Sequence, residues 1–256
     1  MRSIALKPTV WIAVAKEVGD ELRLMELMSV QSLRGEGACF DRLVQFLASA
    51  DFEVAAIDAP FALPLRHMPK GRHTELLHQV KLLPNASDRS FPRGATIVEL
   101  GEAVSPKIEA KPLRKTEQYW ASKGVNTRST MWCGPRGGAA MTAACLRLIE
   151  RSGLSAWPWQ TNKSGLLAEA FPAGQLRQWK LPYFAYSKSE EGDVRAAILD
   201  RLQERIQIKP AHKQIALNCA DALDALIAPF GAIAVAHKSV LAFTGADEEG
   251  YISVAQ

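Results

Sequence analysis

The chain contains little cysteine and histidine, and neither residue is spaced for metal binding or thiol chemistry. Its 256 residues include 4 cysteines and 5 histidines. No CxxC pair occurs, and no histidine follows a cysteine at the spacing of a zinc site. We therefore expect free thiols in a reducing cytoplasm rather than a disulfide framework or a zinc site.

Several other signals are missing from the sequence. No apolar run approaches the roughly 20 residues that span a bilayer, and the first residues are too short and too weakly apolar for a signal peptide. There is no phosphate-binding glycine loop of the Walker type, no serine-nucleophile elbow and no internal repeat. We expect a cytoplasmic globular protein without a membrane segment, and the sequence makes no prediction of its oligomeric state.

The overall composition is that of an ordinary folded domain with a mildly basic balance. Hydrophobic residues make up 48% and charged residues 23%, and the formal net charge is +4. This balance permits an anionic partner such as nucleic acid but does not require one.

The first quarter of the chain predicts a hairpin, a helix and a buried strand. Apolar runs at Thr9–Lys16 and Glu21–Val30, separated by Gly19-Asp20, indicate an antiparallel hairpin. Cys39–Ala48 has helical spacing. Glu53–Asp58 is a short, nearly continuous apolar run, typical of a strand that is buried on both faces of a sheet.

The rest of the chain predicts an α/β domain with a long irregular insertion at about residues 60–138. Inside the insertion, helices are expected at about Thr74–Leu82 and Thr116–Lys123. A helix at Ala139–Arg151, closed by Gly153, and a buried strand at Leu166–Phe171 follow. Further elements are expected at Gly174–Lys180, Asp193–Ile206, His212–Ala228 (ended or kinked by Pro229) and in a terminal strand within Glu249–Val254. Residues 1–256 are read as one domain.

Three apolar segments each lead into a carboxylate. Asp58 and Glu169 follow buried strands, and Asp221 and Asp224 lie three residues apart on one face of a helix. Buried charge is costly unless it is compensated, and a hard divalent cation is one common compensation. If the fold brings these acids together, we expect a Mg²⁺ or Mn²⁺ site and chemistry on phosphate esters.

Each of these features has an ordinary structural explanation. A single acid after a strand is usually a turn former or an ion-pair partner, and only the recurrence of one context favours a site. The basic loop residues Arg128, Arg136 and Lys163 fit a grip on a phosphate backbone, but for Arg128 and Lys163 a solvated basic surface is an equally good interpretation.

Taken together, the motifs resemble the domain of unknown function 429 family, predicted nucleases with a ribonuclease-H-like fold. The matching segments are Ile57–Pro64, Arg114–Glu117, Gly134–Gly137, Glu169–Ala173, Asp221–Ala225 and Glu249–Ile252. The resemblance implies a mixed sheet that begins with an antiparallel hairpin and is flanked by helices. It also implies metal-dependent hydrolysis of DNA or RNA.

The resemblance also assigns roles to individual residues. It implies that Asp58, Glu169 and Asp224 are metal ligands and catalytic residues, and that Asp221 is a ligand or its support. Arg114 and Glu117 match a motif of the family, but the residues themselves do not indicate its role. We expect these two residues and Arg136 to bind the substrate.

One departure from the fold's usual pattern concerns the first strand. Proteins with this fold usually carry an acid at its end, and no aspartate precedes Glu17 here. Either the sequence begins after that strand, with Arg2–Leu6 in its place, or the acid has been lost. From the acids and the resemblance, the first predicted function is a divalent-metal-dependent nuclease. The alternative is a degenerate ribonuclease-H-like module that binds nucleic acid or protein, and a small-molecule phosphotransferase is a weaker third reading.

Overall fold

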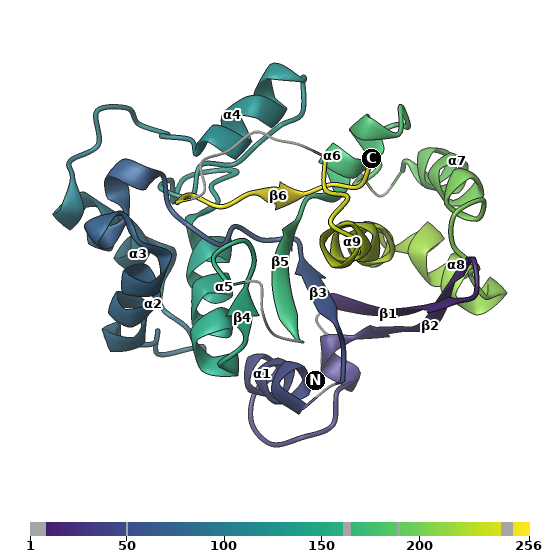
Figure 1. The fold of residues 1–256 in the computed structure, drawn as a ribbon, viewed down its shortest axis with the longest axis horizontal. Coiled ribbons are helices and arrows are strands. Elements are labelled where there is room, and N and C mark those ends of the chain that lie inside the picture. Colours follow the sequence, from purple (N-terminus) through teal and green to yellow (C-terminus); the bar gives the residue numbers. More distant parts are fainter. Residues whose placement is uncertain (1–8, 50, 161–164, 189, 242–247) are drawn as a thin grey trace, which may run out of the picture.

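The computed structural model describes residues 9–49, 51–160, 165–188, 190–241 and 248–256 (Figure 1). It begins with the expected hairpin, strands β1 (Trp11–Val18) and β2 (Glu21–Ser29), which pair antiparallel along their length. Gly19 in the connecting turn has φ +63°, a conformation that glycine adopts without steric cost. The segment Arg2–Leu6 lies outside the described residues.

A parallel sheet forms the centre of the molecule. Strand β5 (Leu166–Ala170) pairs on one side with β3 (Val54–Ile57). On its other side it pairs with β4 (Ser155–Ala156) near its start and with β6 (Ile252–Ser253) near its end. The register places Ile57 beside Glu169, so the carboxyl ends of β3 and β5 meet at one edge of the sheet.

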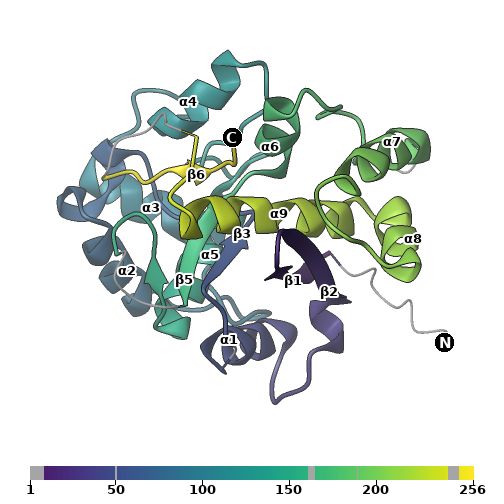
Figure 2. The same cartoon turned by 45° about the vertical axis from the view of Figure 1, so that its right-hand side comes forward.

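Helices cover both faces of this sheet. The helices are α1 (Cys39–Ser49), α2 (His73–Leu82), α3 (Gly94–Val104), α4 (Lys115–Ser122), α5 (Ala139–Ser152), α6 (Pro172–Gln178), α7 (Gly192–Leu202), α8 (Pro210–Asn218) and α9 (Ala220–Ala236). Short 3-10 turns lie at Val30–Ser32, Leu65–His67 and Pro69–Gly71. Helix α9 runs across both the hairpin and the parallel sheet (Figure 2), and it packs against β1, β3 and β5. Helices α1 and α5 pack against the opposite face of the parallel sheet.

Side chains alternate between these two helical layers. Val54 and Ala168 pack with Val235 of α9, whereas Ile57 and Leu167 pack with Ile149 of α5. This alternation is the normal two-residue period of a strand. The result is an α/β protein with an antiparallel hairpin and a parallel sheet between helices.

Two expectations about helices are wrong. The insertion contains the additional helix α3, which begins two residues after Pro92 and buries Ile97 and Val98. The expected helix at His212–Ala228 is divided, because Cys219 has extended backbone angles (φ −139°, ψ 113°) between α8 and α9. Pro229 lies inside the second helix and does not end it, because the helix continues to Ala236; the expected kink stays a prediction. Extensive apolar packing along α9 offsets the hydrogen bond that this proline cannot donate.

The expected burial of β3 on both faces is also wrong. All four of its residues, Val54–Ile57, are only half-buried. Their edge toward β5 is paired, but within the described part of the chain no strand pairs with the other edge. An open edge leaves the flanks of the side chains accessible to solvent.

No single described helix is both long and apolar enough to cross a membrane. Helices α8 and α9 pass that test only as a pair, and they are bent by 119° relative to each other.

Candidate functional site

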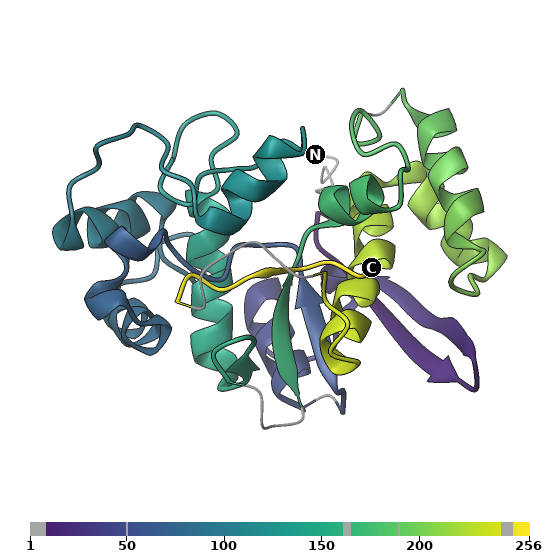
Figure 3. The same ribbon diagram turned by 45° about the horizontal axis from the view of Figure 1, so that its top comes forward.

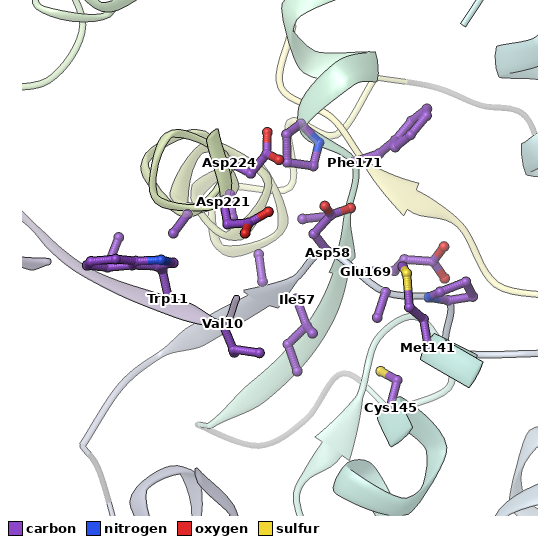
Figure 4. Close-up of a pocket in the computed structure, with 18 of the residues that line it drawn as sticks. Val10, Trp11, Ile57, Asp58, Met141, Cys145, Glu169, Phe171, Asp221 and Asp224 are labelled. Atoms are coloured by element: carbon purple, nitrogen blue, oxygen red, sulfur yellow. The ribbon is translucent and has the colours of Figure 1, made fainter. Parts of the chain in front are cut away.

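A groove of about 2280 Å³ lies where the hairpin, the parallel sheet and α9 meet. Both β1 and β3 line it, and loop residues such as Arg128 and Arg136 lie at its border. Asp58, Glu169, Asp221 and Asp224 all line this groove, so the fold brings these four sequence-distant acids into one region (Figure 4).

The acids do not all point the same way. Glu169 lies beside Ile57 in the sheet, and its side chain leaves on the α5 face together with that of Ile57. Asp58 is the next residue and leaves on the α9 face, because successive strand residues alternate. Figure 4 shows Asp58 turned toward Asp221 and Asp224, with the carboxylate of Glu169 directed away from them.

Helix α9 supplies the other side of this cluster. Asp221 lies in its first turn, and Asp224 follows one turn later on the same face. The Tyr186 hydroxyl donates a hydrogen bond to Asp224 Oδ1 at 2.8 Å. Among the described residues, no side chain donates a hydrogen bond to Asp58 or Asp221, so their oxygens remain available to a ligand.

The surroundings of Asp58, Asp221 and Asp224 disfavour the ionised form of their carboxyl groups. Asp58 is accessible to solvent, but it lies inside the groove with protein on several sides. That partial dehydration, followed by the charges of Glu169 and Asp221, raises the pKa of Asp58 to about 7, and Arg128 opposes the rise. Burial and the charge of Asp58 raise the pKa of Asp224 well above its ordinary value, and burial also raises that of Asp221.

Glu169 belongs instead to a buried ion-pair network. Arg114 Nη1 donates to Glu169 Oε2 at 2.8 Å and Arg114 Nη2 to Glu169 Oε1 at 2.5 Å. The same guanidinium donates to Glu117 Oε1 at 2.9 and 3.1 Å, and the Phe61 N–H donates to Glu169 Oε2 at 2.9 Å. Burial alone would lower the pKa of Arg114, but the two carboxylates outweigh it and raise the pKa.

Arg114 and Glu117 lie in the wall of the groove with their charged groups engaged in this network, and their assignment to substrate binding stays a prediction. Arg114 is 0% exposed and Glu117 is 3% exposed. Glu117 also accepts a hydrogen bond from the Arg114 N–H, which closes the start of α4. The pair connects the insertion to the end of β5.

The predicted trio of metal ligands is therefore assembled only in part. Asp58 and Asp224 lie close enough to influence each other's charge, while both oxygens of Glu169 are occupied by Arg114 and Phe61. In the ranges that the structure describes, no group of three or more histidine, cysteine, aspartate or glutamate side chains is arranged to hold a metal ion. Chemically, the Asp58, Asp221 and Asp224 carboxylates suit a hard cation, and the role of Glu169 as a ligand stays a prediction.

The basic candidates occupy different positions. Arg136 is exposed at the border of the groove with φ +57°. Arg128 is exposed as well, and its charge acts on Asp58. Lys163 lies outside the described residues. The two arginines can contact an anion that enters the groove.

Sequence reasoning missed two residues that organise the site. One is Tyr186, whose only signal was its position in a loop before α7. The other is Glu249, which is 5% exposed and accepts hydrogen bonds from the Leu65 N–H at 2.8 Å and the Lys115 N–H at 2.7 Å. Glu249 thereby fixes both the start of the insertion and the start of α4. Its place in a family-like motif was a signal, but not of this role.

The fold and the groove define the class of the protein. It is an α/β protein in which acids from a sheet edge and from a crossing helix share one groove. The chain belongs to the family described as "Protein of unknown function (DUF429)", which matches residues 6–249. No curated protein and no solved structure matches the chain.

Proposed function

We propose that the protein is a divalent-metal-dependent nuclease with a ribonuclease-H-like arrangement, acting at the aspartate cluster of the groove. The observation that supports this most directly is the convergence of Asp58, Asp221 and Asp224, where Arg128 is the one counter-charge among the described residues that acts on Asp58. Three carboxylates in a partly enclosed groove either take up protons or bind a cation.

In this proposal, Asp58, Asp221 and Asp224 would hold the metal after their side chains move into coordinating positions, because they are not so arranged among the described residues. A bound Mg²⁺ or Mn²⁺ would supply an activated water and neutralise charge on the phosphoryl oxygens. Tyr186 keeps the Asp224 carboxylate in a fixed orientation through its hydroxyl. Arg128 and Arg136 contact the phosphates of a nucleic acid at the groove border. Arg114 holds Glu169 and Glu117, and so fixes the end of β5 behind the site.

Cleavage assays test this proposal. Labelled single- and double-stranded DNA and RNA would be incubated with the protein and Mn²⁺ or Mg²⁺, and parallel samples would contain EDTA. We expect cleavage that EDTA abolishes and that Asp58→Asn and Asp224→Asn remove. Asp20→Asn is the matched control, because Asp20 is exposed in the hairpin turn and does not line the groove. Metal-dependent cleavage that persists in Asp58→Asn would contradict the proposed site.

A second candidate function is a non-catalytic module that binds nucleic acid or protein. The commitment of Glu169 to Arg114 favours it, because that ion pair removes one of the three expected ligands. Under this alternative, the protein binds nucleic acid in EDTA and leaves it intact with every metal tested. Filter binding alongside the cleavage assay separates the two functions.

A further inference from the structure

One aromatic side chain at the groove is left in solvent by the fold. Phe184, in the loop between α6 and α7, is 68% exposed and lines the groove. Of the aromatic side chains in the described ranges, it is the only exposed one. Its ring meets that of Tyr183 edge-on, with 5.5 Å between the ring centroids, and most of its surface stays accessible. Single exposed apolar residues are common, so the way in which the loop holds this ring decides its meaning.

A strained turn separates Phe184 from the next aromatic residue. Ala185 has φ +68°, a conformation that is unfavourable for residues other than glycine. After this turn Tyr186 is buried and donates its hydrogen bond to Asp224, whereas Phe184 stays outside. Strained backbone persists only where the surrounding structure fixes it, and it is concentrated at functional sites.

A buried arginine fixes this turn. Arg195 of α7 donates hydrogen bonds to the carbonyl oxygens of Tyr186 and Lys188, each at 2.6 Å. Its Nε donates to the carbonyl oxygen of Leu217, at the end of α8, at 2.7 Å. The Lys188 N–H donates to the Ala185 carbonyl oxygen at 2.8 Å and closes the turn. The exposed ring is therefore carried by a fixed loop, which reduces the entropy that a ligand must remove on binding.

The loop that follows α4 lies beside the loop of Phe184. An added Cβ on Gly124 would lie 3.5 Å from the Tyr183 hydroxyl oxygen. Arg177 connects the two loops, because its Nε donates to the Lys123 carbonyl oxygen at 3.1 Å and its guanidinium lies 5.4 Å from the centroid of the Tyr183 ring. Figure 3 shows α4 and the green loop between α6 and α7 at the top of the view, above the parallel sheet.

These two loops also supply exposed cations to the groove. Arg128 and Arg136 come from the loop after α4, and Lys188 comes from the loop of Phe184. The charge of Arg128 acts on Asp58, so the cations reach the aspartate cluster. Cations for the phosphates and an aromatic ring for a base are the two parts of a site for single-stranded nucleic acid. A base inside a duplex is stacked on its neighbours and offers no free face to such a ring.

We propose that the groove takes single-stranded nucleic acid and that one of its unpaired bases stacks on Phe184. Phe184 lies two residues before Tyr186, which holds Asp224, so the stacked base is close to the phosphate at the aspartate cluster. The inference rests on the proposed function for the kind of ligand. It is separable from that function, because stacking requires neither metal nor cleavage.

Fluorescence anisotropy in EDTA measures this binding directly. The probes are a fluorescein-labelled oligothymidylate of about 12 nucleotides and a duplex of the same length, both at about 50 mM salt. We expect the single strand to bind at least roughly tenfold more tightly than the duplex. Phe184→Ala should weaken single-strand binding roughly tenfold. Phe184→Trp should retain it, whereas Phe184→Leu should behave like Phe184→Ala because leucine has no π face.

Two controls separate stacking from other effects. Ile108→Ala is the matched control, because Ile108 is exposed and apolar but does not line the groove, and it should bind normally. An oligonucleotide of the same length without bases should bind equally to Phe184→Ala and to the unaltered protein. Lys188→Gln should lower the slope of log affinity against log salt by about 0.7, as expected for one phosphate contact on a single strand. Phe184→Ala should leave that slope unchanged.

Several results would overturn the assignment. These are equal affinity for the duplex and the single strand, equal affinity of Phe184→Ala and the unaltered protein, and no binding of the single strand in EDTA. The cleavage assay is judged separately. Metal-dependent cleavage with an unchanged KM in Phe184→Ala would reject the stacking and leave the nuclease proposal intact. Binding that depends on Phe184, without cleavage under any metal, would reject the nuclease and retain the single-strand site.

Discussion

At the scale of single residues, the alternation of side chains between the two faces of the sheet decides which acids lie together. Asp58 and Glu169 are neighbours at one sheet edge, but their side chains leave on opposite faces. Asp58 faces the accessible aspartates of α9, whereas Glu169 pairs with Arg114 in the interior. One group of acids is therefore available to a ligand, and the other holds the structure together.

The raised pKa of Asp58 predicts a pH-dependent stability. The folded state holds this proton up to about pH 7, whereas an unfolded chain releases it near pH 4. Stability should therefore fall as pH rises from about 4 to 7. In EDTA, Asp58→Asn should raise Tm at pH 8 by about 3 °C, which corresponds to about 1 kcal/mol after allowance for solvent screening. At pH 4.5 the same variant should change Tm little.

Differential scanning fluorimetry of the two proteins across this pH range makes the measurement. Asp20→Asn provides the control, with no expected change at either pH. An equal shift of Asp58→Asn at pH 4.5 and pH 8 would mean that its charge carries no cost in the folded state.

The buried ion pairs predict a large cost for removing their cation. Arg114→Met leaves Glu117 and Glu169 buried without a cationic partner, and we expect a loss of about 3–5 kcal/mol in the free energy of unfolding. Urea denaturation measures it. Adding Glu169→Gln to the variant should recover part of the loss. Arg89→Met, which breaks an exposed pair with Asp88, should cost less than about 1 kcal/mol. Similar losses for both arginines would contradict the buried network.

At the scale of elements, α9 packs against both the hairpin and the parallel sheet, whose described strands do not pair with each other. The helix approaches β6 closely at Gly231, where an added Cβ would lie 2.7 Å from Ser253 Oγ and 2.8 Å from its carbonyl oxygen. Such a distance leaves no room for a methyl group. The glycine is therefore required by packing, although its backbone is helical.

Gly231→Ala should consequently destabilise the protein by about 1–3 kcal/mol, because α9 must move away from β6. Gly192→Ala is the matched control, since nothing lies within 4 Å of an added Cβ there, and alanine should be neutral or slightly stabilising. Thermal denaturation of both variants measures the difference. A neutral Gly231→Ala would place α9 further from β6 than the structure does.

Local patterns in the sequence predicted most elements, and long-range contacts account for the errors. The hairpin, α1, α5 and β5 follow from apolar period and end signals in their own residues. Helix α3 was not predicted because prolines lie on both sides of it. The break at Cys219 was not predicted because no glycine or proline marks it. For the site, the acids could be selected from sequence, but the pairing of Glu169 with Arg114 joins residues 55 positions apart. Only the sheet register and the choice of face determine it.

At the scale of the whole molecule, the acidic character of the groove contrasts with the positive net charge of the chain. A chain with net charge +4 places Asp58, Asp221 and Asp224 together at the meeting point of two sheets and one helix. Strands β1 and β3 line the same groove beside the acids. We interpret its acidic part as a site for a divalent cation.

Direct titration of the protein with Mn²⁺, followed by electron paramagnetic resonance of the free ion, tests the central claim that the groove aspartates bind a divalent cation. We expect saturable binding that Mg²⁺ displaces, that weakens by roughly 100-fold or more in Asp58→Asn, and that is unchanged in Asp20→Asn. Free Mn²⁺ at every concentration in the unaltered protein, or equal binding by Asp58→Asn, would contradict the account.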